Sequence, residues 1–127
     1  AIPQMRRTGG GVIVNTASIS GLAADPGLAT YNAAKGAVVN YTRSLAVDHA
    51  RDGIRVNAVC PGPVETPLLL PALGLPGVRE EYAKLIPMGR VAEPDEIAGA
   101  AVYLLSDAAS YVTGQVLTCD GGLRFAA

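Results

Sequence analysis

The chain has 127 residues, of which 50% are apolar, with 10 Lys and Arg against 11 Asp and Glu and a formal net charge of -1. This composition is typical of an ordinary globular domain and not of a disordered chain. The scattered cations argue against a nucleic-acid partner, and neither a signal peptide nor an apolar run of about 18 residues is recognisable. We therefore expect one domain in a soluble protein of the cytoplasmic type.

The first half of the chain predicts two strands around a long helix. A short β-branched run follows three glycines and predicts a buried strand over 11–16. A helix is expected over 28–50, because apolar residues recur there every three or four positions and Gly53 follows as a stop signal. A second strand is predicted over 54–59 and is expected to end before Pro61, because proline cannot continue a ladder.

The second half predicts one more helix and one more strand. Residues 64–92 form a long, proline-rich connection, in which a short helix over 78–85 is one interpretation. A helix is predicted over 94–105, because Pro94 is favoured at a first helical position and acidic residues follow it. The β-branched residues 112–118 predict the last strand, which leads into a glycine-containing turn.

Strand, helix, strand, helix and strand in this order predict a right-handed parallel α/β unit with helices on both faces of the sheet. Three strands make a thin sheet, residues 1–7 resemble only the tail of a helix, and the chain starts without Met. We therefore expect residues 1–127 to be the C-terminal half of a larger domain, incomplete without an N-terminal half.

Several residues with reactive side chains have structural interpretations. Cys60 and Cys119 lie in apolar runs without metal-ligand spacing, so we interpret them as small buried hydrophobic residues and expect no metal site. His49 lies in the charged end of the long helix, where it is expected to offset the terminal carbonyls. The five leucines from Leu68 to Leu75 leave two interpretations open, an apolar lid or packing on the body or on a partner subunit.

Tyr31 and Lys35 lie four residues apart on the long helix, so their side chains share one face. A cation about 4 Å from a phenolate stabilises it by about 4 kcal/mol at an effective dielectric constant of about 20, which would suit Tyr31 for acid–base chemistry. Such helical pairs are also common without any chemical role. Ser18 follows the carboxyl end of the first strand, where open α/β sheets bind ligands, although it also fits a turn residue together with Ser20.

The ordered motifs are Asn15-Thr16-Ala17-Ser18, Tyr31-x-x-x-Lys35, Arg55-Val56-Asn57-x-x-x-Pro61-Gly62-x-x-x-Thr66, Ser106-Asp107 and Asp120-Gly121-Gly122. With these motifs the chain resembles the short-chain dehydrogenase/reductase family over essentially its whole length. The resemblance implies a doubly wound, parallel, Rossmann-like sheet. The Tyr-x-x-x-Lys spacing resembles that of the alcohol dehydrogenases and ketoreductases rather than the enoyl reductases of this fold.

The resemblance implies hydride transfer between a nicotinamide cofactor, NAD or NADP, and a small-molecule alcohol/ketone pair. Ser18 would donate a hydrogen bond to the substrate oxygen, and Tyr31 would pass a proton to or from that oxygen. Lys35 would favour the tyrosinate and hydrogen-bond the nicotinamide ribose, for which its ammonium donors are suited.

A second group of residues is implied to bind the nicotinamide. Pro61 and Gly62 would form a wall against its ring, while the backbone of Val64 and the hydroxyl of Thr66 would meet its carboxamide. Without the resemblance, Pro61 and Gly62 would be interpreted as a plain turn. Family members commonly form dimers or tetramers through the helix that carries Tyr31 and through the last strand, so a homo-oligomer is implied too.

Three parts of the family pattern are not found in this sequence: the glycine-rich cofactor loop, the Asn-Ala-Gly segment and the catalytic asparagine of the family's fourth helix. The glycine-rich cofactor loop, Thr-Gly-x-x-x-Gly-x-Gly, should follow a first strand and open a helix, whereas the glycines at 9–11 precede a strand and are interpreted as a connector. The sequence therefore predicts an oxidoreductase, with a non-catalytic truncated remnant that acts in binding or subunit assembly as the alternative. A hydrolase that uses Ser18 is not favoured, because no base at a strand end would activate the serine.

Overall fold

The computed structural model of the chain describes residues 1–126. Its strands β1 (Gly11–Thr16), β2 (Ile54–Pro61) and β3 (Val116–Cys119) form one parallel sheet in the order β1-β2-β3. The carboxyl ends of all three strands therefore lie at the same edge of the sheet. The open sheet of parallel strands with helices is the predicted fold class.

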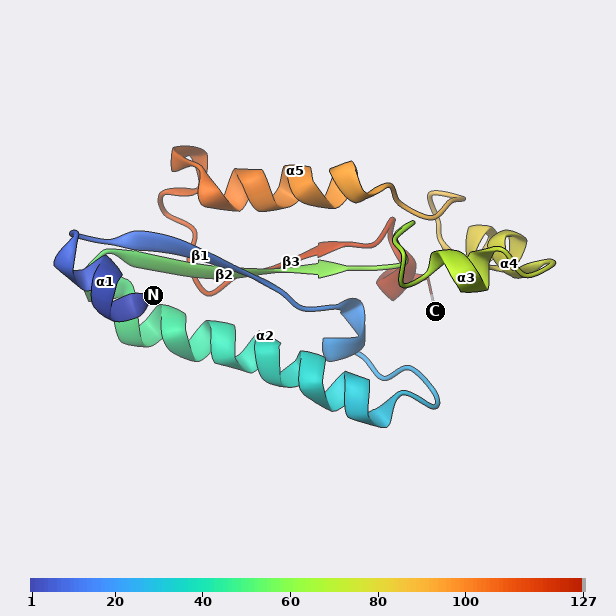
Figure 1. Cartoon of the computed structure of the whole chain (residues 1–127), viewed down its shortest axis with the longest axis horizontal. Coiled ribbons are helices and arrows are strands. Elements are labelled where there is room, and N and C mark those ends of the chain that lie inside the picture. The colour runs from blue at the N-terminus through green and yellow to red at the C-terminus, as the bar shows by residue number, and fades with distance from the viewer. Residues whose placement is uncertain (127) are drawn as a thin grey trace.

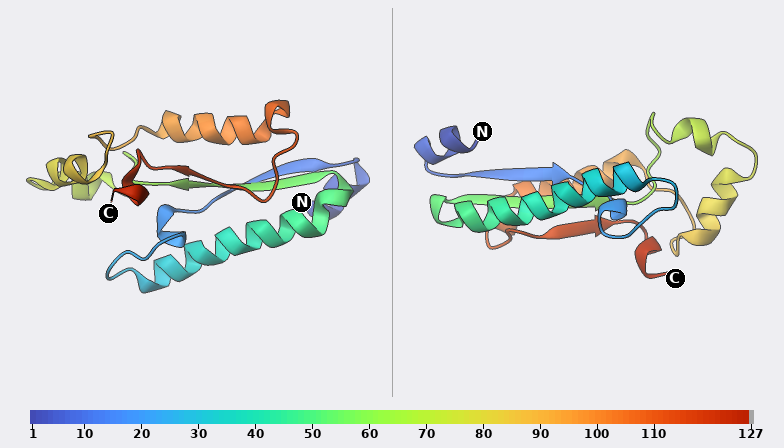
Figure 2. Two further views of the ribbon diagram at one scale, coloured as in Figure 1. Left: turned by 180° about the vertical axis from the view of Figure 1, so that it is seen from behind. Right: turned by 90° about the horizontal axis from the view of Figure 1, so that it is seen from below.

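Helices cover both faces of the sheet. The long helix α2 (Ala29–His49) lies on one face and α5 (Pro94–Leu105) on the other, so the molecule has three layers (Figure 1). The short helices α3 (Leu70–Leu73) and α4 (Val78–Leu85) lie beyond the carboxyl ends of β2 and β3, and α1 (Ile2–Arg7) lies at the opposite end (Figure 2). The helices expected over 28–50, 78–85 and 94–105 are thus present as α2, α4 and α5.

The core lies between the sheet and α2. Alternate residues of β2 point toward this helix, as the period of two in a strand requires. Two buried clusters fill the layer: Ile54 and Val56 with Ala46, and Ala58 and Cys60 with Val39. Each fully buried aliphatic side chain of this kind stabilises the fold by about 1.5–3 kcal/mol, so this layer holds α2 in place against the sheet.

On the opposite side of β2, the polar side chains of Arg55 and Asn57 secure the connection from α5 to β3. The Arg55 guanidinium donates to the carbonyl oxygens of Ser106 and Val112 at 3.1 and 3.2 Å. The buried Asn57 amide donates to the carbonyl of Val112 at 2.8 Å and accepts from the backbone N–H of Gln115 at 3.0 Å. These bonds explain why an Arg and an Asn stand in an otherwise apolar strand, since their side chains bond to backbone groups of this connection.

Strand β2 continues through Pro61, beyond the predicted end at residue 59, and the physical reason is the direction of its N–H groups. Ala58 donates at 2.9 Å to Gln115, directly before β3, and Gly62 donates at 3.0 Å to Cys119 of β3, so the alternate nitrogen of Pro61 faces the other neighbour. That neighbour, β1, has already ended at Thr16. Proline is therefore tolerated, because a donor at this position would have no ladder partner.

Strand β3 begins at Val116, later than the prediction of 112–118. Gly114 has a φ of +70°, which interrupts the extended backbone, although its N–H still donates to the carbonyl of Val56 at 2.7 Å. The hydroxyl of Thr113 accepts from the N–H of Val56 at 3.0 Å. The residues before Val116 therefore bond to β2 as a connection and not as a regular strand.

The connection over 64–92 is more ordered than expected. Besides α3 and α4, it contains an isolated parallel bridge between Val64 and Ala92. Leu73, Ile86 and Val91 are buried together and form a small separate core under the two short helices. This cluster holds the segment against the carboxyl edge of the sheet.

Cys60 is fully buried, and burial raises the pKa of its thiol. Cys119 is only half-buried, although burial raises its pKa as well. His49 does not contact the helix carbonyls as expected; its Nδ1 lies 3.0 Å from the carboxylate of Asp52, which also bonds to Arg6 at 2.7 Å. Within residues 1–126, no helix combines the length and the hydropathy needed to cross a membrane.

Candidate functional site

A cavity of about 820 Å³ opens at the carboxyl edge of β1 and β2. Open α/β sheets bind their ligands at this edge. Its walls come from the turn after β1, the start of α2, the end of β2 and one side of α5. All the site residues predicted from the sequence line it: Ser18, Tyr31, Lys35, Pro61, Gly62, Val64 and Thr66.

Tyr31 and Lys35 share one face of α2, as their spacing predicts. The Lys35 Nζ lies 5.7 Å from the centre of the Tyr31 ring, which is a cation–π distance. The same Nζ donates to the carbonyl oxygen of Thr16, the last residue of β1, at 3.2 Å. The ammonium is thus held between the strand end and the Tyr31 ring, and its remaining N–H groups can donate to a ligand.

The turn after β1 packs unusually closely on α2. This 3₁₀ turn, η1 (Ile19–Gly21), ends in a glycine whose missing Cβ would lie 2.6 Å from both the carbonyl carbon and the carbonyl oxygen of Lys35. Only glycine permits this approach, because any side chain would meet backbone atoms. The contact fixes the turn that carries Ser18 against the helix that carries Tyr31.

Ser18 is both a turn residue and a cavity residue. It precedes η1 as its N-cap, and its Oγ accepts from the backbone N–H of Ser20 at 3.2 Å. Its side chain lines the cavity although Ser18 is only 8% exposed. The two interpretations of Ser18 are therefore compatible: the cap holds its hydroxyl at the edge of the cavity.

Two further polar residues of the cavity were not singled out as site residues from the sequence. Ser20 is 6% exposed, and its Oγ accepts a hydrogen bond from Ser18 Oγ at 3.1 Å. The Ser20 hydroxyl in turn donates to the carboxylate of Asp25. The backbone carbonyl of Asp25 accepts from the side-chain amide of Asn32, the neighbour of Tyr31, at 3.0 Å. In the sequence, Ser20 and Asp25 belong to a Ser-x-Ser spacing followed by an Asp directly before Pro-Gly. This local pattern is typical of a turn and does not by itself indicate a site.

The opposite wall is built from the end of β2. Pro61 is the last residue of β2, and the N–H of Gly62, which follows it, donates to the carbonyl of Cys119 at 3.0 Å. Beyond them, the backbone N–H of Thr66 donates to the carbonyl of Val64 at 2.8 Å, in a tight bend. Pro61 thus belongs to the strand, and Gly62 directly after it is tied to the end of β3.

The leucine-rich segment contributes to the apolar side of the cavity. Leu68 and Leu69 both line it, and Leu68 is 85% exposed. Leu69 also packs against the small core that contains Leu73. One end of the segment is thus anchored on the body while the other borders the cavity, so packing on the body is observed and the apolar lid stays a prediction.

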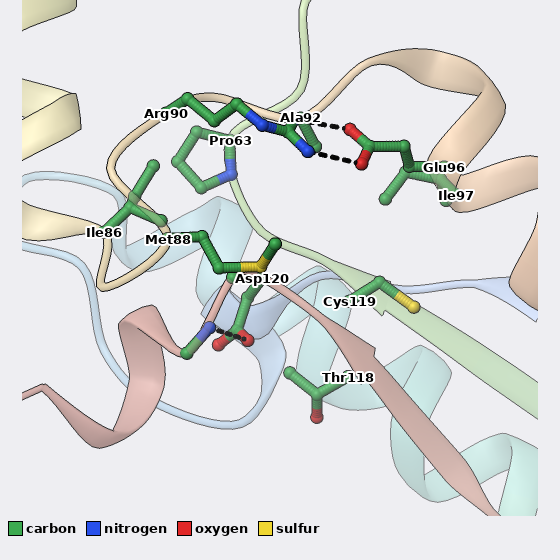
Figure 3. Close-up of a pocket in the computed structure, with 12 residues that line it drawn as sticks. Pro63, Ile86, Met88, Arg90, Ala92, Glu96, Ile97, Thr118, Cys119 and Asp120 are labelled. Carbon is green, nitrogen blue, oxygen red and sulfur yellow. Dashed lines mark hydrogen bonds and ion pairs between the residues drawn. The ribbon is translucent and has the colours of Figure 1, made fainter.

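A second cavity, of about 500 Å³, adjoins the first and shares Pro63 and Ile97 with it (Figure 3). Its charged groups are paired with one another or with the backbone. The Arg90 guanidinium binds both carboxylate oxygens of Glu96 at 2.7 Å, and this bond lowers the pKa of Glu96 to about 2. The Asp120 carboxylate accepts from two backbone N–H groups at 3.0 and 2.9 Å. The groups suited to acid–base chemistry therefore lie in the first cavity.

The glycines at 9–11 lie at the other end of the sheet, where they lead from α1 into Gly11, the first residue of β1. Gly10 has a φ of +132°, and a Cβ on it would lie 2.6 Å from the carbonyl oxygen of Gly53. This run is the connector that its position in the sequence indicates. Among residues 1–126, no three His, Cys, Asp or Glu side chains gather as they would around a metal ion.

Comparison with known proteins gives consistent matches over this chain. A family model described as enoyl-(acyl carrier protein) reductase matches residues 1–124. The uncharacterized oxidoreductase YxbG of Bacillus subtilis is 46% identical over 128 aligned residues, which cover 96% of this chain and 46% of the relative. The meso-2,3-butanediol dehydrogenase of Serratia marcescens is 48% identical over 123 residues, which cover 96% of this chain and 47% of the relative.

Solved structures give the same picture. The crystal structure of a gluconate 5-dehydrogenase from Burkholderia cenocepacia, in complex with NADP and tartrate, superimposes with a TM-score of 0.95 at 38% sequence identity. The match covers 99% of this chain and 49% of that one. The chain thus spans about half the length of the curated relatives it matches.

Proposed function

The chain belongs to the short-chain dehydrogenase/reductase family, and from this premise we propose that it carries the acid–base and nicotinamide-binding part of an oxidoreductase. The reaction is hydride transfer between NAD or NADP and an alcohol/ketone pair. The observation that carries the proposal is the single cavity that collects Ser18, Tyr31 and Lys35 at the carboxyl edge of the sheet. The names of the dehydrogenase relatives support an alcohol/ketone pair over an enoyl substrate.

Tyr31 is the acid–base residue of this proposal. It takes the hydroxyl proton of the alcohol during oxidation and returns a proton to the carbonyl oxygen during reduction. Lys35 lies over the Tyr31 ring, so its positive charge stabilises the phenolate that this exchange forms. Ser18 holds the same substrate oxygen by a hydrogen bond, which fixes the reacting carbon relative to Tyr31.

The cavity fits the nicotinamide end of the cofactor. Its volume of about 820 Å³ lies within the usual range for small-molecule sites. Pro61 and Gly62 provide a rigid wall with little side chain, and the Lys35 ammonium, held by Thr16, can bind ribose hydroxyls. When bound, the cofactor supplies the hydride, while Val64 and Thr66 meet its carboxamide.

The remaining wall sets the kind of substrate. Ile97 of α5 and the leucines of the connection make this side apolar, so it excludes water from the reacting oxygen. We expect a small-molecule alcohol or ketone in the cytoplasm, and neither a nucleic acid nor a membrane as partner. Residues 1–127 would act as the C-terminal part of one Rossmann-like domain.

The outer face of α2 supports a homo-dimer or homo-tetramer. Tyr41 and Val47 are 61% and 81% exposed on this helix. Members of this family commonly form dimers or tetramers through the corresponding helix, so these side chains lie where another subunit would pack. The proposal therefore includes assembly through α2.

The test combines cofactor titration with two substitutions. The purified protein is titrated with NADH and NADPH by fluorescence, and turnover is measured with secondary alcohols. Tyr31→Phe is expected to lower turnover by at least about 10²-fold with cofactor affinity nearly unchanged, because only the proton-transferring oxygen is lost. Lys35→Ala is expected to weaken both.

Tyr111→Phe serves as the matched control, since Tyr111 is fully exposed at the other end of the sheet. Retained turnover in Tyr31→Phe would refute the acid–base assignment. A protein that binds neither cofactor would instead support the alternative, a non-catalytic remnant that acts in binding or subunit assembly.

A further inference from the structure

Asp25 is the one acidic residue, and Lys35 the one basic residue, among the residues 1–126 that line the candidate cavity. Lys35 is already engaged with Thr16 and the Tyr31 ring. Lys35 keeps its positive charge there, whereas a negative group of a ligand that contacts Asp25 would be repelled by the Asp25 carboxylate. The charge around Asp25 therefore favours an uncharged group of the ligand.

The Asp25 carboxylate is held in a fixed orientation. Its Oδ2 accepts from Ser20 Oγ, which in turn lies 3.1 Å from Ser18 Oγ. Its backbone carbonyl is tied to α2 by the amide of Asn32 at 3.0 Å. Asp25 is therefore preorganised two hydrogen bonds away from the hydroxyl that binds the reacting oxygen of the substrate.

The second carboxylate oxygen of Asp25 remains available. Within residues 1–126, Oδ1 accepts no hydrogen bond, while the side chain lies partly exposed in the cavity wall. A carboxylate oxygen is acceptor-only, so the group it suits is a donor, such as a hydroxyl. A substrate hydroxyl next to the reacting carbon would reach it from the position that Ser18 and Tyr31 define.

We propose that Asp25 is a substrate-binding residue that selects uncharged substrates with a second hydroxyl beside the reacting carbon, and that it excludes carboxylates at the same place. This inference rests on the proposed function, because it needs the reacting oxygen to lie between Ser18 and Tyr31. The second hydroxyl donates to Asp25, and a carboxylate there is repelled by it. The cavity is thus a site for 1,2-diols and hydroxyketones.

Three small probes test the proposal, because they share one secondary alcohol and differ only in the neighbouring group. Propane-1,2-diol carries a hydroxymethyl group there, propan-2-ol a methyl group and lactate a carboxylate. We expect kcat/KM to be highest for the diol, about tenfold lower for propan-2-ol and lowest for lactate, since a hydrogen bond to a charged acceptor is worth about one order of magnitude in binding. Dissociation constants from ligand-observed NMR titrations in the presence of cofactor give the same comparison without turnover.

Two substitutions separate the hydrogen bond from the charge. Asp25→Ala should abolish the diol preference over propan-2-ol and should bring lactate close to propan-2-ol. Asp25→Asn keeps an acceptor oxygen but loses the charge. It should therefore keep part of the diol preference, but, unlike the parent, it should also admit lactate. Asp48→Asn, which removes the same charge from the exposed surface of α2, should change none of these ratios.

The outcomes distinguish the inference from the proposed function. The inference is overturned if both Asp25 variants keep the parent's ratios of kcat/KM among the three probes. It is also overturned if kcat/KM falls equally for all three probes, because that is the effect of an Asp25 with a merely structural role. If Ser18→Ala leaves the binding of all three probes unchanged, the reacting oxygen does not lie at Ser18 and the proposed function itself is wrong. Ser20→Thr, which keeps the hydroxyl that orients Asp25, should preserve the diol preference that Ser20→Ala weakens.

Discussion

Gly62 lies so close to Asp120 that a Cβ on the glycine would be 2.8 Å from the Asp120 Cβ and 2.9 Å from its Cα. Asp120 cannot easily yield, because its carboxylate accepts hydrogen bonds from two backbone N–H groups. The wall formed by Pro61 and Gly62 is therefore clamped from behind by the turn that follows β3. Two segments almost 60 residues apart in the sequence define this side of the cavity together.

Gly62→Ala is expected to displace this wall. The added methyl group would lower the free energy of unfolding by about 1–3 kcal/mol and would weaken NADH or NADPH binding, because overpacking forces the backbone to move. Urea unfolding and cofactor titration measure the two effects. Gly99→Ala is the matched control: it adds the same methyl group to α5 with nothing within 4 Å, so it should raise stability by up to about 1 kcal/mol. Equal stability of the two variants would contradict the clamp.

Gly21→Ala is expected to separate Ser18 from Tyr31. A Cβ at Gly21 would lie 2.6 Å from the carbonyl of Lys35, so the turn η1 must move away from α2. Turnover should fall by at least about tenfold, because misplacing a catalytic group by about 1 Å has effects of this order or larger. Gly36→Ala approaches the same contact from the helix side, but its Cβ would meet the carbonyl oxygen of Gly21 at an ordinary 3.6 Å. Comparable losses in both variants would rule out the close approach at Gly21 as the cause.

The ion pair of Arg90 and Glu96 predicts a stability contribution that depends on pH. The pKa of Glu96 is lowered from its ordinary 4.5 to about 2, first by the bond to Arg90 and then by the backbone N–H of Glu93. A lowered carboxyl pKa stabilises the folded state above pH 4.5, and this contribution is lost as the pH falls from 4.5 toward 2. Glu96→Gln should therefore lower Tm at pH 7 and approach the parent near pH 2. A Tm difference that is constant over this pH range would show that the ionised carboxylate is not responsible.

The two cysteines are expected to differ in their reactivity. Cys60 is fully buried and Cys119 half-buried, while burial raises the pKa of both thiols. In the folded protein at pH 8, iodoacetamide should therefore modify Cys119 slowly and Cys60 only after unfolding, as peptide mass spectrometry would show. Cys60→Ser should lower the free energy of unfolding by about 1–3 kcal/mol relative to Cys60→Ala, because it places a hydroxyl in an apolar core. Rapid labelling of Cys60 in the native state would contradict its burial.

Local patterns in the sequence determined the main elements. The β-branched run at β1, the spacing of apolar residues along α2 and the start of α5 at Pro94 each depend on neighbouring residues only, and the structure agrees with them. The parallel topology follows from their order. Because all strand carboxyl ends then meet at one edge, the sequence could also indicate that Ser18, Tyr31 and Pro61 share a site, and the structure brings them into one cavity.

Tertiary contacts decided the rest, because they join segments whose separation no local pattern encodes. Pro61 extends β2 only because β1 has already ended beside it. Asp25 looks like a turn residue in the sequence, and its carboxylate becomes a group of the cavity only through Ser20 and through the tie to α2. Charge and hydrogen bonding act across space, so the sequence by itself predicted the site residues, while only the folded chain placed Asp25 in the wall of the cavity that they line.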